Sequence, residues 1–122
     1  MLGSLDLEGR VAVVIGGTSG LGRSISISLA EGGAHVVASG RRGQLVEDVA
    51  AQIEKIGRRT MRETVDVSSR ASIDGLRDRV MGEFGHVDVL VNAAGRISRI
   101  KTKDLPEAEW HSTLDTNLTG ML

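Results

Sequence analysis

Seven residues near the start of the chain combine glycines with small polar side chains in a way that suits phosphate binding. They read Gly16-Gly17-Thr18-Ser19-Gly20-Leu21-Gly22 and follow the apolar run 11–15. Glycine permits a tight turn and lets the backbone approach a pyrophosphate closely. The N–H groups and dipole at the start of a following helix attract the same anion. This turn therefore predicts a dinucleotide phosphate site. The residues expected to contact the cofactor are Gly16, Thr18, Ser19, Gly20, Leu21 and Gly22.

Two arginines bear on the choice of cofactor. In dinucleotide-binding folds, an acidic residue about 20 residues past the glycines bonds the ribose 2′-hydroxyl of NAD. Here the corresponding strand ends in Ser39-Gly40-Arg41-Arg42, with no acid. An arginine fork can hold a 2′-phosphate through charge-assisted hydrogen bonds, whereas a carboxylate would repel it. Arg41 and Arg42 therefore favour NADP, with NAD as the second choice. The alternative interpretation is that both are solvated charges at the start of the next helix.

The same turn comes close to a second phosphate-binding motif. Residues 17–24 read GTSGLGRS, which fits the P-loop pattern GxxxxGK[ST] except that Arg23 replaces the lysine. A P-loop enzyme also uses an acidic residue at the end of a later strand to hold magnesium. Asn92 stands at that point in this chain. A P-loop-like nucleotide-binding protein is therefore the less favoured alternative.

The elements that would position these residues alternate between short β-branched runs and helical patterns. Strands are predicted at residues 11–15, 35–39, 60–67 and 87–91. Four segments between and after them repeat apolar residues at helical spacing. Their stripes are Leu21, Ile25, Leu29; Leu45, Val49, Ile53, Ile56; Ile73, Leu76, Val80, Phe84; and, after Pro106, Trp110, Leu114, Leu118, Met121.

This order predicts an α/β fold, a Rossmann-type doubly wound parallel sheet with strand order 3-2-1-4. A complete sheet of this kind has about six strands, and only four are predicted here. We therefore expect residues 1–122 to form the N-terminal half of an NAD(P)-binding Rossmann domain, with the rest of the protein absent. The fourth strand would then be an exposed edge, which predicts self-association.

Composition narrows the function classes. The chain has 122 residues, no cysteine and a formal net charge of -1. The length suits one domain, and the charge gives no reason to expect nucleic acid or an anionic membrane as a partner. Neither a secretory signal nor a membrane-length apolar run is evident, and no residues show metal-ligand spacing. We expect a soluble, cytoplasmic protein.

Four motifs, each on the expected element, resemble the short-chain dehydrogenase/reductase family. The turn has that family's GxxxGxG spacing, although Ile15 replaces the threonine that usually precedes it. Asp66-Val67 is similar to its adenine-contacting pair, and Asn92-Ala93-Ala94-Gly95 to its NNAG signature with Ala93 in place of an asparagine. Asn117 falls where the family carries a catalytic asparagine. The resemblance implies a catalytic role for Asn117 and cofactor contacts at Asp66, Val67, Asn92, Ala93, Ala94 and Gly95.

Plainer structural interpretations remain open for three of these residues. Asp66 can cap the following segment through its carboxylate, and Asn92 can stabilise the turn after its strand. Asn117 can bond locally to backbone.

The resemblance also implies hydride transfer between a nicotinamide and a small carbonyl or alcohol. It calls for a tyrosine as general acid/base, a lysine four residues later and a serine. The chain contains no tyrosine, and Lys55, Lys101 and Lys103 lie upstream of the expected lysine position. We therefore expect this chain to bind NADP without turning over substrate. The alternative is a non-catalytic dinucleotide-binding or assembly module.

Overall fold

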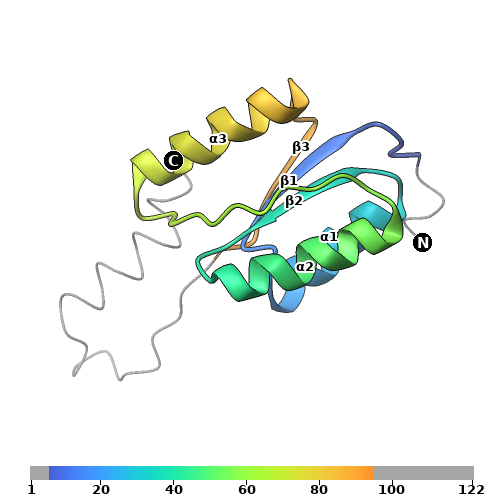
Figure 1. The fold of residues 1–122 in the computed structure, drawn as a ribbon, viewed down its shortest axis with the longest axis horizontal. Helices are drawn as coiled ribbons and strands as arrows, with labels where there is room; N and C mark the ends of the chain where they lie inside the picture. The colour runs from blue at the N-terminus through green and yellow to red at the C-terminus, as the bar shows by residue number, and fades with distance from the viewer. Residues whose placement is uncertain (1–5, 95–122) are drawn as a thin grey trace.

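The computed structural model describes residues 6–94, which form a parallel sheet of three strands with helices on both faces (Figure 1). The strands lie in the order β2-β1-β3, and all pairs are parallel. The elements along the chain are β1 (Val11–Ile15), α1 (Gly20–Glu31), β2 (His35–Ser39), α2 (Gly43–Ile56), α3 (Arg70–Phe84) and β3 (Val89–Asn92). The predicted α/β fold with a parallel, Rossmann-like sheet is confirmed.

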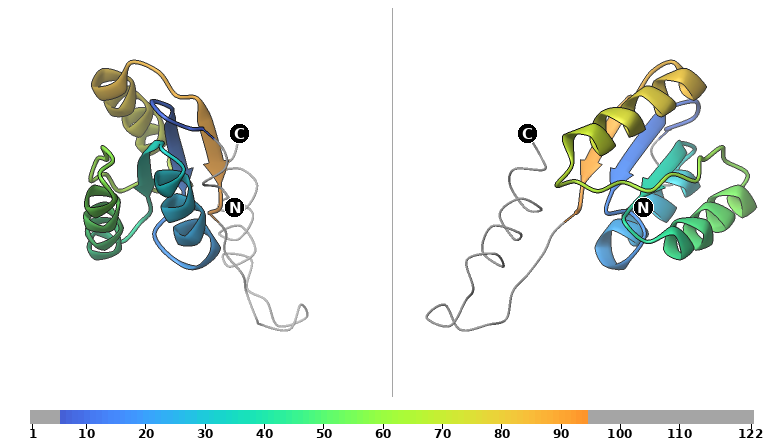
Figure 2. Two further views of the ribbon diagram at one scale, coloured as in Figure 1. Left: turned by 90° about the vertical axis from the view of Figure 1, so that its right-hand side faces the viewer. Right: turned by 60° about the vertical axis from the view of Figure 1, so that its left-hand side comes forward.

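Alternate residues of the central strands face two separate apolar layers. Ala12 and Val14 of β1 pack with α1 and α2, whereas Val13 packs with Leu76 and Val80 of α3. A strand buried on both faces reads as a continuous apolar run, which explains the sequence VAVVI. In Figure 2, α3 accordingly lies on one side of the sheet and α1 and α2 on the other.

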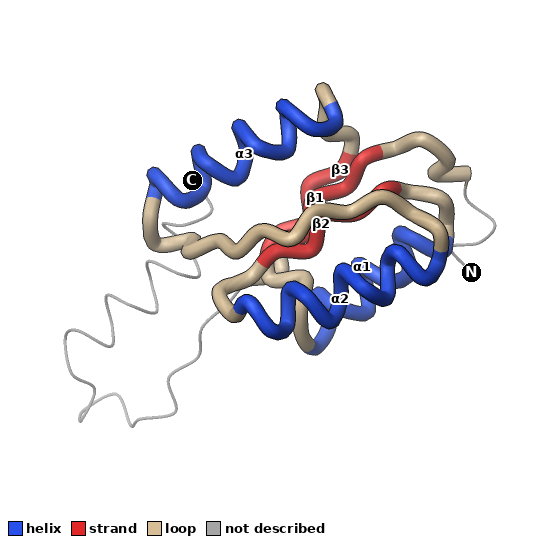
Figure 3. The backbone as a smooth tube through the Cα atoms, in the orientation of Figure 1, coloured by secondary structure: helices blue, strands red, loops and turns tan. Residues whose placement is uncertain are grey.

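The prediction of a third strand at residues 60–67 is wrong, although the segment lies beside β2, where that strand was expected. Residues 60–67 make a single bridge, between Thr64 and Gly40 at the end of β2. Figure 3 shows this segment as a loop running beside β2, so the expected order 3-2-1-4 appears with a loop in place of strand 3 and β3 as strand 4. Beside this bridge, the Ser39 hydroxyl donates a hydrogen bond to the Glu63 carbonyl.

Charged side chains also hold this segment to both helix layers. Arg62 bonds Glu47 and Glu54 of α2, and Glu63 pairs with Arg79 of α3. The segment is therefore attached by side chains that a buried strand would not carry, which accounts for its irregular backbone.

The first helix also differs from its prediction. Its buried residues are Gly22, Ser26 and Ala30, while Leu21 of the predicted apolar stripe is 76% exposed. Small side chains let α1 approach the sheet closely, so the buried face is not the most apolar one. The other two helices bury the predicted faces, and Gly57 and Gly85 end them in the left-handed conformation.

No helix within residues 6–94 combines the length and apolarity needed to cross a lipid bilayer. The predicted fourth helix, Gly95 and Asn117 lie outside the described residues.

Candidate cofactor-binding site

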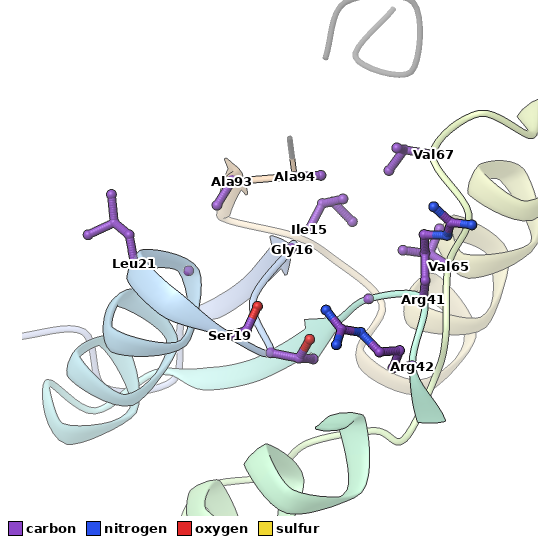
Figure 4. A pocket seen from close by; sticks show the side chains of 13 residues that line it. Ile15, Gly16, Ser19, Leu21, Arg41, Arg42, Val65, Val67, Ala93 and Ala94 are labelled. Atoms are coloured by element: carbon purple, nitrogen blue, oxygen red, sulfur yellow. The ribbon is translucent and has the colours of Figure 1, made fainter. Parts of the chain in front are cut away.

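A cavity of about 670 Å³ opens at the carboxyl edge of the sheet, where the chain turns from β1 into α1 (Figure 4). Ligands of doubly wound sheets bind at this edge, at the point where the strand order reverses. Four segments far apart in sequence meet there: the glycine turn, the end of β2, the loop before α3 and the residues after β3. The lining residues are Ile15, Gly16, Thr18, Ser19, Leu21, Gly22, Gly40, Arg41, Arg42, Val65, Val67, Ala93 and Ala94.

Close backbone packing explains why glycines are needed in the turn. A Cβ at Gly22 would lie 1.9 Å from the Gly16 carbonyl oxygen, and one at Gly16 would lie 2.5 Å from the Ala94 nitrogen. Gly16 also has φ of 77°, which larger residues avoid. Its N–H and that of Gly17 both donate to the Ser39 carbonyl. The turn is thus fixed to β2 and to the segment after β3.

The start of α1 lies beside the cavity, whose lining includes Thr18, Ser19, Leu21 and Gly22. Ser19 is the N-cap, but its side chain makes no capping hydrogen bond. Within residues 6–94, the five consecutive N–H groups from Thr18 to Gly22 find no acceptor. The first-turn donors of a helix need partners, and together with the helix dipole they favour an anion. This row of donors can therefore bind a diphosphate.

Arg41 and Arg42 follow β2 and face the same cavity. Figure 4 shows the Arg42 guanidinium directed toward the side of Ser19, while Arg41 extends along Val65. Neither has an ion-pair partner among the residues that the structure describes, and Arg23 and Arg70, also near this edge, have none. The arginines elsewhere in that part of the chain are all paired. Unpaired positive charge therefore gathers at the cavity.

Asp66 and Val67 are placed differently from one another. Val67 lines the cavity, whereas the Asp66 carboxylate accepts hydrogen bonds from the hydroxyl and the N–H of Ser68, at 2.7 and 3.0 Å. These bonds, the hydroxyl first, lower the pKa of Asp66 below its usual value, with a smaller contribution from the charge of Arg41. The structure thus shows the local capping bond, and the adenine contact stays a prediction.

The residues of the motif that begins at the end of β3 also lie in different places. Asn92 ends β3 opposite Ile15 and borders a second, mostly apolar cavity of about 500 Å³ beside α3. Ala93 and Ala94 line the first cavity, and the Ala93 N–H donates to the Ile15 carbonyl. Gly20 has φ of 55° and does not border the cavity. Asn92 and Gly20 therefore shape the turns that carry the lining residues.

Three lining residues escaped the sequence analysis: Ile15, Gly40 and Val65. Gly40 had a usable signal, because a glycine between a strand and two arginines suggests close packing. A Cβ there would lie 2.7 Å from the Thr18 hydroxyl. Nothing in the spacing of Ile15 or Val65 distinguishes them from ordinary core residues.

Comparison with known proteins places the chain in a family. The family description "short chain dehydrogenase" matches residues 10–122. The chain therefore belongs to the short chain dehydrogenase family, as the resemblance in the sequence indicated.

Relatives and solved structures agree with this assignment. The 2-dehydro-3-deoxy-D-gluconate 5-dehydrogenase of Escherichia coli is 36% identical over 99% of this chain and 47% of its own length. The D-threitol dehydrogenase of Mycolicibacterium smegmatis is 36% identical over 93% of this chain and 44% of its own. A short chain dehydrogenase of Burkholderia cenocepacia, solved in complex with NADP, superposes with a TM-score of 0.90 at 33% identity, covering 94% of this chain and 47% of its own. The chain spans about half the length of the curated relatives it matches.

Proposed function

We propose that this chain is the NADP-binding part of a dehydrogenase that transfers a hydride between the nicotinamide and a small carbonyl or alcohol. The observation that carries the proposal is the pairing of two features at one cavity. Arg41 and Arg42, which have no ion-pair partner among residues 6–94, line one side. The start of α1 lies on the other, and the N–H groups of residues 18–22 find no acceptor within the same described residues. Membership of the short chain dehydrogenase family supports the reaction class.

Each part of the cofactor has suitable partners among the lining residues. The N–H groups of residues 18–22 hold the diphosphate, and Arg41 and Arg42 hold the 2′-phosphate. The buried side chains of Val65 and Val67 offer an apolar surface for the adenine. The bound cofactor supplies or accepts the hydride, and this chain's own residues orient it.

The preference for NADP over NAD follows from charge. The described part of the cavity wall holds no carboxylate that would bond a ribose 2′-hydroxyl and repel a phosphate. Two guanidinium groups without an ion-pair partner in the part of the chain that the structure describes favour the cofactor that carries the extra phosphate. A related structure holds NADP, which is consistent with this choice.

Calorimetric titration of the chain with NADPH, NADH and ATP tests the proposal. We expect NADPH to bind about tenfold or more tightly than NADH, and ATP to bind weakly. Arg41→Ala and Arg42→Ala should each weaken the binding of NADPH without changing the affinity for NADH. The control Arg77→Ala, on the exposed surface of α3, should change neither affinity. Tighter binding of NADH, or equal losses for both cofactors, would contradict the preference. Tightest binding of ATP would favour the P-loop alternative.

The division of the enzyme is a second part of the proposal. The chain contains no tyrosine and spans about half the length of its relatives. We propose that residues 1–122 are the N-terminal, cofactor-binding half of the domain, that Asn117 joins the catalytic residues, and that proton transfer relies on residues beyond this sequence. The chain alone should not oxidise NADPH with a ketone at a measurable rate. Turnover would contradict this division. A downstream reading frame without Tyr-x-x-x-Lys would favour the non-catalytic module.

We also propose that the 122-residue chain self-associates through the exposed edge of β3. Leu90 of β3 is 69% exposed, and β3 pairs on one side only within the part of the sheet described. An open strand edge with apolar side chains is a template for pairing with a second copy. Light scattering should show oligomers of the 122-residue chain, and a monodisperse monomer would contradict this. The cytoplasmic location stays a prediction.

A further inference from the structure

Ser26 is a polar residue on the face of α1 that packs against the sheet. Its side chain is fully buried, at 0% exposure. The Oγ atom lies 2.9 Å from the Gly22 carbonyl oxygen and 3.2 Å from the Gly17 carbonyl oxygen, both within hydrogen-bond distance. A buried hydroxyl on this face therefore connects the second turn of α1 to the glycine turn that precedes the helix.

The hydroxyl has one proton to share between these two acceptors, and the two carbonyl groups differ in how much they need it. The Gly22 carbonyl belongs to α1 and can accept the helical N–H four residues later. The Gly17 carbonyl lies in the turn and has no other donor within residues 6–94. Loss of the Ser26 hydroxyl would leave the Gly17 carbonyl unpaired next to the core, which is costly.

The direction of the Gly17 carbonyl determines the direction of the next N–H. In a trans peptide the C=O and N–H bonds point to opposite sides, so a Gly17 carbonyl turned inward to Ser26 turns the Thr18 N–H outward. Thr18 lines the cavity, and its N–H is the first of the five open donors. A Cβ at Gly17 would lie 2.7 Å from Ser26 Oγ, so the contact also requires glycine there.

We infer that Ser26 is a positioning residue for the cofactor diphosphate: its hydroxyl holds the Gly17–Thr18 peptide so that the Thr18 N–H faces the cavity. Ser26 acts through the backbone and does not touch the cofactor. The inference rests on the proposed function, because it requires a diphosphate at the glycine turn. The opposing interpretation is that the Ser26 hydroxyl bonds only to the Gly22 carbonyl, four residues back, as serines in helices often do. Ser26 would then fill space in the core without affecting the turn.

Two ligands separate these interpretations. NADPH carries the diphosphate, whereas adenosine 2′-monophosphate lacks it and can engage only the Arg41 and Arg42 side of the cavity. Titration of Ser26→Ala should show NADPH binding weakened by about tenfold, with adenosine 2′-monophosphate unchanged. The control Ser24→Ala removes an exposed hydroxyl from the same helix and should leave both affinities at their original values.

The results that would overturn the inference are distinct from those that would overturn the proposed function. A folded Ser26→Ala chain with unchanged NADPH affinity, or with equal losses for both ligands, would overturn the role of Ser26. Should Ser26→Ala fail to fold, Ser26→Cys can be used instead, because its thiol has a similar size to the hydroxyl and is a weaker hydrogen-bond donor. It should lose NADPH affinity selectively but by a smaller factor, and an unchanged ratio of the two affinities would overturn the inference. An original chain that binds no NADPH would contradict the proposed function itself.

Discussion

Helices α1 and α3 begin at the same edge of the sheet with the same N-cap residue type, yet only one of the two N-cap side chains makes a capping hydrogen bond. Ser69 caps α3, since its hydroxyl accepts the Ser72 N–H at 3.2 Å. Ser19 at α1 makes no such bond and leaves the first turn without acceptors in the part of the chain described. The difference teaches that an N-cap serine does not by itself close a helix start. Where the donors are left open beside a cavity, they are available to an anion.

The glycines inside the two helices repeat the contrast. Gly22 in α1 is wedged against the Gly16 carbonyl, whereas a Cβ at Gly82 in α3 would meet no atom within 4 Å. The start of α1 is therefore closely packed, whereas α3 has room for a side chain at position 82. Three pairs of variants test this comparison.

The largest effect is expected from adding a methyl group to each helix glycine. Gly22→Ala forces the turn away from its position, and we expect a loss of about 3 kcal/mol of stability together with loss of measurable NADPH binding. Gly82→Ala should stabilise the chain by up to about 1 kcal/mol, because alanine favours the helix. Thermal unfolding and titration check both. Retained NADPH affinity in Gly22→Ala would show that the packing behind the turn is dispensable.

The two N-cap serines should respond in opposite ways. Ser69→Ala removes a cap and should cost about 1 kcal/mol of stability with NADPH affinity unchanged. Ser19→Ala removes no capping bond, so stability should change by less than about 0.5 kcal/mol, while NADPH binds a fewfold more weakly through the loss of a hydroxyl that lines the cavity. Denaturant titration and calorimetry give the two readouts. Equal stability losses in the two variants would mean that Ser19 is also a cap.

The smallest effect concerns the turn that leads into α3. The Ser68 hydroxyl and N–H hold the pKa of Asp66 below its usual value, so the carboxylate stabilises the folded chain above about pH 4. This contribution is lost as the pH falls through the lowered pKa of the folded state. The difference in Tm between the original chain and Asp66→Ala should therefore shrink between pH 7 and pH 3. Ser68→Ala should reproduce part of that difference, and a pH-independent gap would contradict the assignment.

Most of the fold could be predicted from the sequence, because β-branched runs and helical spacing report local burial. Prediction failed where tertiary contacts override that pattern. Residues 60–67 look like a strand, but Arg62 and Glu63 bond to α2 and α3. The stripe through Leu21 looks like the buried face of α1, but close approach to the sheet selects Gly22 and Ser26 instead.

The candidate site was predictable to the extent that its residues carry a motif. The glycine turn, Arg41 and Arg42 were found because their types and spacing have a mechanical meaning, and most of them line one cavity. Val65 was missed because it reaches the site through the loop beside β2, which no spacing reveals, whereas Gly40 lies at the end of β2 and its signal was overlooked. The hydrogen bond from Ser26 to Gly17 was equally hidden, since it depends on how far α1 approaches the turn.

Backbone amide hydrogen exchange with and without saturating NADPH tests the central claim most directly. If the open start of α1 holds the cofactor diphosphate, NADPH should slow exchange of the amides of residues 18–22 and leave the capped Ser72 amide of α3 unchanged. Cofactor binding with no protection at residues 18–22, or with protection at α3 instead, would contradict the account.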